Sequence, residues 1–102
     1  MKTYTLYKSS NSSKKYDVFV ISSKGNIKKI SFGAEGYSDF TKHKDPERKQ
    51  RYITRHKTRE NWNKSGIETA GFWSRWILWN KPTIRDSMND TRKRFNLSTD
   101  YI

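Results

Sequence analysis

The chain has 102 residues, with 22 Lys and Arg against 10 Asp and Glu, and a formal net charge of +12. This length fits one domain, and so large an excess of positive charge favours an anionic partner. The absence of cysteine excludes disulfides and thiolate metal sites. Because no run approaches the ~20 apolar residues that cross a bilayer and no secretory signal is evident, we expect an intracellular protein without membrane contact.

The chain is predicted to have a folded central part between two less ordered ends. Residues 1–15, which include a Ser-rich stretch at 9–13, are expected to be flexible or weakly ordered, and residues 96–102 are expected to form a C-terminal tail. Four Trp, six Tyr and five Phe must supply most of the core. A disordered basic chain would lack them, so residues 16–95 are predicted to form a single basic domain.

The N-terminal part of this domain is predicted to form a β-hairpin. Residues 16–21 and 27–32 are rich in β-branched and aromatic side chains, and residues 22–26 between them contain Gly25 and Asn26, which tolerate positive φ. A third strand near Tyr4 and Leu6 would extend the hairpin to a three-stranded antiparallel sheet.

Three helices are expected to follow, which makes the predicted fold class α+β. Asp45 can cap a helix over about 46–60 that begins at Pro46. Helices over about 70–79 and 83–95 carry apolar side chains at helical spacing and should pack inward. Their predicted core residues are Phe72, Trp73, Trp76, Trp79, Ile84, Met88 and Phe95.

The first of these helices carries the main functional signal. Arg48, Arg51, Arg55 and Arg59 follow the spacing i, i+3, i+7, i+11 and would line one side of the helix. One guanidinium group can donate hydrogen bonds to two oxygens of a phosphate at once, so a row of arginines can follow a phosphate backbone. The alternative is an ordinary solvated charged face. The candidate nucleic-acid-binding residues of this segment are Lys42, Lys44, Arg48, Arg51, Arg55, Lys57 and Arg59.

Further candidates lie on the hairpin and in a loop. Lys24, Lys28 and Lys29 could contact a phosphate backbone, or could protect an exposed strand edge from pairing. Lys14 and Lys15 could add contacts from the flexible segment. Trp62, in a polar loop, is a candidate for stacking on a base. Packing against the arginine-rich helix is its alternative role.

Catalysis finds little support in the sequence. Only His43 and His56 are present, neither has a companion at metal-ligand spacing, and the acidic residues are scattered. No Gly-rich phosphate loop ends in Lys-Ser or Lys-Thr. We therefore expect a protein that is not an enzyme and that uses neither a metal nor a cofactor.

Four segments of the chain resemble one known family. They are Ser31-Phe-Gly33, His43-Lys-Asp-Pro-Glu-Arg48, Arg51-Tyr-Ile-Thr-Arg-His56 and the run from Thr69 to Pro82 with its Gly-Phe-Trp-Ser-Arg-Trp block. The chain resembles, over roughly residues 16–95, short basic uncharacterised proteins encoded by large DNA viruses of algae and protists. The resemblance implies a viral origin and a place in virions or at viral replication sites, and it supplies no catalytic residues.

The function expected from the sequence is sequence-tolerant binding of nucleic acid, DNA before RNA, by the arginine-rich helix. The first alternative is a structural virion, minor capsid or packaging protein that binds acidic protein surfaces or other virion proteins. The second is a nucleic-acid-processing enzyme.

Overall fold

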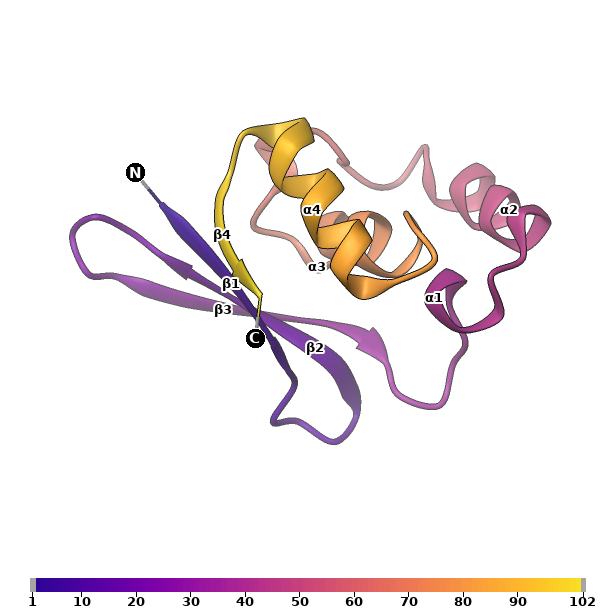
Figure 1. Ribbon diagram of the computed structural model, residues 1–102, viewed down its shortest axis with the longest axis horizontal. Coiled ribbons are helices and arrows are strands. Elements are labelled where there is room, and N and C mark those ends of the chain that lie inside the picture. Colours follow the sequence, from indigo (N-terminus) through magenta and orange to yellow (C-terminus); the bar gives the residue numbers. More distant parts are fainter. Residues whose placement is uncertain (1, 102) are drawn as a thin grey trace.

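The computed structural model describes the backbone of residues 2–101 and the side chains of residues 2–98, and it shows one sheet with helices packed on one face (Figure 1). The strands are β1 (Thr3–Lys8), β2 (Lys14–Ile21), β3 (Ile27–Ala34) and β4 (Ser98–Tyr101). The helical segments are α1 (Phe40–His43), α2 (Pro46–His56), η1 (Lys64–Gly66), α3 (Ala70–Trp73), η2 (Ser74–Leu78) and α4 (Ile84–Phe95).

The sheet has the strand order β3-β2-β1-β4. β1, β2 and β3 are antiparallel neighbours, with Leu6 opposite Val18 and Val18 opposite Ile30. β4 runs parallel to β1. The expected α+β fold, in its three-stranded N-terminal form followed by helices, is confirmed.

The prediction of a weakly ordered segment 1–15 is wrong for the part described. β1 lies inside the sheet between β2 and β4, and its Leu6 is completely buried. Lys15 is 5% exposed, and its Nζ contacts Asp39 Oδ2 at 2.5 Å, so it is not free for a ligand. The alternation of apolar and polar residues in β1 is too short to predict a strand firmly. Pairing with β2 and β4 stabilises the strand. Met1 lies outside the described residues.

The predicted C-terminal tail 96–102 is also ordered over most of its length. Asn96 ends α4 in a left-handed conformation with φ 55°, and Leu97 is buried in the core. The chain then turns back to form β4 against the free edge of β1. Pairing of backbone groups at that edge explains the strand, because an unpaired edge leaves donors and acceptors unsatisfied. Ile102 lies outside the described residues.

The three main helices each begin at a side-chain cap, of which Asp45 was predicted. The side chains of Asp45, Thr69 and Thr83 accept backbone hydrogen bonds at the starts of α2, α3 and α4. α2 ends at His56, four residues before the expected end. α1 was not expected from the sequence, and the side chain of Asp39 caps it.

The helix predicted over 70–79 changes its winding halfway. α3 is followed directly by the five-residue π-helical turn η2, in which Trp79 N donates to Ser74 O at 3.2 Å. An extra residue in a helical turn rotates the side chains that follow. Trp76, Ile77 and Leu78 are all buried as a result of this arrangement.

The core lies between the sheet and the segments α3, η2 and α4. Of the predicted core residues, Phe72, Trp73, Trp76 and Met88 are buried, while Trp79, Ile84 and Phe95 are partly buried and pack against them.

Close approach of η2 to the sheet depends on Gly33 in β3. Its φ is +78°, and a Cβ at this position would lie 2.7 Å from Leu78 Cδ1. No side chain fits there without displacement.

Candidate nucleic-acid interface

α2 is attached to the rest of the protein through one face. Tyr52 is its only buried side chain, and its ring lies on Trp79 with centroids 4.4 Å apart and on Trp62 with centroids 6.2 Å apart. In Figure 1, α2 lies at one end of the molecule, away from the sheet. Most of its circumference is therefore exposed to solvent.

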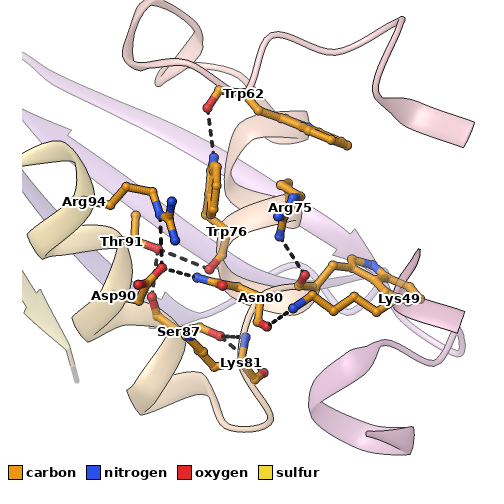
Figure 2. A network of polar contacts seen from close by, with 11 residues as sticks. Lys49, Trp62, Arg75, Trp76, Asn80, Lys81, Ser87, Asp90, Thr91 and Arg94 are labelled. Carbon is orange, nitrogen blue, oxygen red and sulfur yellow. Dashed lines mark hydrogen bonds and ion pairs between the residues drawn. The ribbon is translucent and has the colours of Figure 1, made fainter. Parts of the chain in front are cut away.

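Lys49 also faces inward and differs from the other basic residues of α2. Its Nζ donates to Asn80 O at 2.7 Å (Figure 2), and it also lies 4.9 Å from the centroid of the Phe40 ring. Burial, and then the nearby charges of Arg75 and Lys81, lower the pKa of Lys49. Lys49 therefore holds α2 in place and does not belong to the ligand-facing set.

The loop that receives Lys49 is fixed by a polar network (Figure 2). Asn80 Nδ2 donates to Asp90 Oδ2 at 2.8 Å, and Arg94 Nε donates to the same oxygen at 3.2 Å. Arg75 donates to Trp79 O at 2.8 Å, with its guanidinium carbon 4.3 Å from the ring centroid of Trp76. Residues 79 and 80 are thus hydrogen-bonded to Arg75 and Asp90, and the carbonyl of Asn80 also accepts the hydrogen bond from Lys49 of α2.

Three arginines of α2 are free of acidic partners. Arg48, Arg51 and Arg55 are exposed. The ion pairs among residues 2–98 are Lys2–Glu68, Lys28–Glu68, Lys15–Asp39 and Arg94–Asp90. We call Arg48, Arg51 and Arg55 the arginine row. Because no carboxylate in the described part of the chain pairs with them, their guanidinium groups remain available to an anion.

A cleft runs beside the arginine row, between α2, η2 and the loop after β3. Its volume is about 460 Å³, and its lining includes Arg48, Arg55, Tyr52, His56, Trp79 and Tyr37. Tyr37 is 73% exposed at its edge. Cationic and aromatic side chains together suit a ligand that combines phosphate with flat rings.

The two histidines near α2 have lowered pKa values. His56 stacks on Tyr52 with centroids 4.4 Å apart, and burial followed by the charge of Arg59 lowers the pKa of His56. Burial and then the charge of Arg48 lower the pKa of His43, whose Nδ1 accepts a hydrogen bond from Asp45 N. Its Nε2 is buried, and no side chain or backbone group in the described part of the chain hydrogen-bonds to it.

The other basic candidates near α2 are exposed but do not all join the row. Lys42 and Lys44 lie in α1 and at its end, and Lys57 and Arg59 follow α2. Because α2 ends at His56, the predicted extension of the helix to residue 60 is wrong, and Arg59 lies in the turn that follows, where helical spacing no longer fixes its direction.

The hairpin lysines form a separate surface. Figure 1 shows the turn between β2 and β3 at the opposite end of the molecule from α2, so Lys24, Lys28 and Lys29 are not brought to the arginine row. Lys28 Nζ lies 3.4 Å from Glu68 Oε1.

Trp62 packs inward and is not an open stacking surface. It is half-buried, with its ring near Tyr52 and the guanidinium of Arg75 5.4 Å from its centroid. Trp62 therefore packs against the arginine-rich helix α2, which was the alternative role considered for it. Its Nε1 is buried and has no hydrogen-bond partner among the residues that the structure describes.

Tyr37 and Tyr52 were missed as candidate ligand contacts. Tyr52 appears in the sequence as an apolar position of the helix, and nothing local shows that its ring also borders a cleft. Tyr37 follows Gly36 in a polar loop, and an aromatic residue in such a loop was a signal that could have been used.

The fold and surface define a small α+β domain that displays a basic helix beside a partly aromatic cleft. The chain belongs to a family of unknown function, DUF5754, whose sequence profile matches residues 4–56. That match includes β1, β2, β3, α1 and α2, and therefore the arginine row. Neither the curated proteins nor the solved structures contain a match to the chain.

The described residues contain neither a candidate membrane span nor a cluster of metal ligands. None of their helices is both long and apolar enough to cross a membrane. No group of three or more His, Asp or Glu side chains among them is arranged to hold a metal ion.

Proposed function

We propose that the chain binds nucleic acid without strong sequence preference, through the arginine row and the cleft beside it. The observation that carries this proposal is the exposure of three arginines on one helix, with no carboxylate among residues 2–98 paired to them. Phosphates recur along any nucleic acid, so a row of guanidinium groups serves every sequence. Following the viral resemblance, we propose that this ligand is a viral genome or transcript.

The geometry supports contacts that are mainly to phosphate. Arg48 and Arg55 border the cleft, and Arg51 lies beside Arg55 on the outer side of α2. Lys42, Lys44 and Lys57 are exposed close to the two ends of α2. If these six groups neutralise about six phosphates, log affinity against log salt has a slope near −5 on duplex DNA.

A charge-reversal variant tests the proposal. The triple variant Arg48→Glu, Arg51→Glu, Arg55→Glu is expected to reduce the salt slope by about 3, since each phosphate contact contributes about 1. Gel shifts with a mixed-sequence duplex over a series of salt concentrations measure it. Circular dichroism melting shows whether the variant is folded, as we expect for exposed positions.

The matched control reverses the same number of charges elsewhere. Arg85, Arg92 and Lys93 are exposed on α4 and make no ion pair with any described side chain. Changing all three to Glu alters the net charge equally, so it measures the contribution of total charge alone. Equal losses of binding in the two variants, or no binding by the unmodified protein at low salt, would refute the assignment to α2.

A further inference from the structure

The face of the sheet opposite the helices is uncovered and partly apolar. Side chains of successive residues point to opposite faces of a sheet, and Tyr4, Leu6, Val18 and Val20 belong to the core. Their neighbours therefore form the open face, in cross-strand pairs such as Thr5 with Phe19 and Ile21 with Ile27. In Figure 1, α3 and α4 lie on one side of the sheet only.

An aromatic groove lies on this open face. It has a volume of about 480 Å³, and its lining includes Thr5, Tyr7, Phe19, Ile21 and Ile27. Tyr7 is 38% exposed and Ile27 66% exposed. The rings of Tyr7 and Phe19 come from adjacent strands and meet edge to face, with centroids 5.5 Å apart. Two neighbouring rings on an open sheet form a surface on which planar groups can stack.

The accessible charge around this groove is positive. Lys29 is the cross-strand partner of Phe19, and Lys8 lines the groove; both are exposed. Neither makes an ion pair with another described side chain. Lys24 is exposed in the turn at the end of the same hairpin.

The carboxylate that lines this groove, that of Asp17, is buried and already hydrogen-bonded. Asp17 is 2% exposed, and its two oxygens accept hydrogen bonds from Ser9 Oγ at 2.8 Å, Ser31 Oγ at 2.7 Å and Ser10 N at 3.4 Å. Burial alone would raise the pKa of Asp17, and these hydrogen bonds outweigh it and lower the pKa. Its charge is thus held inside a ring of donors.

We propose that this open face binds single-stranded nucleic acid, with bases stacked on Tyr7 and Phe19 and backbone phosphates near Lys8 and Lys29. This inference rests on the proposed function and specifies the form of its ligand. An unpaired strand offers accessible base faces together with phosphates, and a duplex keeps its bases stacked inside. A second copy of the chain is disfavoured as the occupant, because each copy carries a net charge of +12.

The surface is distinct from the arginine row. The residues that line the groove come from β1, β2, β3 and the turn after β1, and none of them lines the cleft beside α2, so the two regions can be altered independently. We expect α2 to contact phosphates of either duplex or single strand, and the sheet face to add affinity only for unpaired bases.

The test variant is Tyr7→Thr, Phe19→Thr, because Thr is favoured in strands and has no ring. Fluorescence anisotropy compares a 20-nucleotide oligothymidylate with a duplex of equal length. We expect the variant to lose at least about tenfold in affinity for the single strand, as removal of stacking rings does, and to change less than about twofold for the duplex. The matched control Tyr7→Phe, Phe19→Tyr keeps both rings and should retain single-strand affinity.

The outcomes separate this inference from the proposed function. Unchanged single-strand affinity in the Thr variant, with lower affinity in the arginine-row variant, overturns the inference and leaves the function of α2 intact. Lower single-strand affinity in the Thr variant, with no effect of the arginine-row variant on either probe, supports the sheet face and overturns α2. A ligand-free dimer in sedimentation, abolished by the Thr variant, also overturns the inference.

A measurement on the unmodified chain covers the case in which the Thr variant does not fold. Adding oligothymidylate to the ¹⁵N-labelled protein is expected to shift the amide resonances of residues 5–7 and 17–21. Shifts confined to residues 46–56 would overturn the inference.

Discussion

The ring of Tyr52 lies flat on the ring of Trp79, with centroids 4.4 Å apart and an angle of 2° between their planes. Tyr52 is the only buried residue of α2, and Trp79 directly follows the π-helical turn η2. This contact thus joins the helix that carries the arginine row to the core. Loss of the contact should affect stability and ligand binding together.

Removing the Tyr52 ring should loosen α2. We expect Tyr52→Ala to lower the free energy of unfolding by about 3 kcal/mol, as for other buried aromatic truncations, and to weaken nucleic-acid binding although every arginine remains. Urea denaturation and gel shifts measure the two effects. Tyr52→Phe keeps the stacked ring and should retain most of both. A Tyr52→Ala variant with normal stability would show that α2 is held by other contacts.

Lys15 and Asp39 form a buried ion pair that can be tested by removing one partner. Asp39 also accepts a hydrogen bond from Thr41 N at 2.9 Å at the start of α1. We expect Asp39→Ala to cost about 3–5 kcal/mol, because Lys15 remains buried without its counter-charge. The double variant Lys15→Met, Asp39→Ala should be more stable than Asp39→Ala alone. If the double variant is the less stable one, the uncompensated charge is not the cause.

Gly33 offers a test of how closely η2 approaches the sheet. Gly33→Ala combines an unfavourable positive φ with a Cβ 2.7 Å from Leu78 Cδ1. Gly25 also has positive φ, at +87°, with nothing within 4 Å of the added Cβ, so Gly25→Ala measures the backbone effect alone. We expect that effect to be about 1–2 kcal/mol, and Gly33→Ala to lose more. Equal losses in thermal or urea unfolding would mean that Leu78 adjusts without cost.

Stability should depend on pH through His43 and His56. The pKa of each lies below its ordinary value of about 6.5 because burial disfavours the charged ring. The unfolded chain therefore takes up protons first, and the folded chain loses stability as pH falls from about 6.5 through the lowered pKa values. Urea denaturation at pH 8, 7, 6 and 5 measures this loss. His56→Gln should reduce the loss between pH 7 and 5, and an unchanged pH profile would exclude His56 as a source.

Elements with local signals were predicted from the sequence. Asp45 was predicted to cap α2, because a cap needs only a side-chain oxygen and nearby backbone N–H groups. The strands 16–21 and 27–32 were predicted from composition and a short turn. A strand near Tyr4 and Leu6 was predicted as a third strand of the sheet, but β4 was not predicted, because Thr3 and Ser98 are distant in sequence and only the folded chain pairs them.

The candidate site was predicted only where local sequence signals define it. Helical spacing alone places Arg48, Arg51 and Arg55 on neighbouring turns of α2, but it does not place Arg59, because α2 ends at His56. The cleft could not be predicted, since Tyr37 and Trp79 reach it from separate segments. The open sheet face required the register that places Phe19 opposite Thr5.

The parallel pairing of β4 with β1 has a consequence for protein synthesis. β1, β2 and β3 can form their antiparallel contacts soon after the first residues leave the ribosome, because the turns between them are short. The outer backbone groups of β1 then stay unpaired until residues 98–101 have been made. During this interval the strand can pair with another nascent chain, and the strong mutual repulsion of such cationic chains opposes that aggregation.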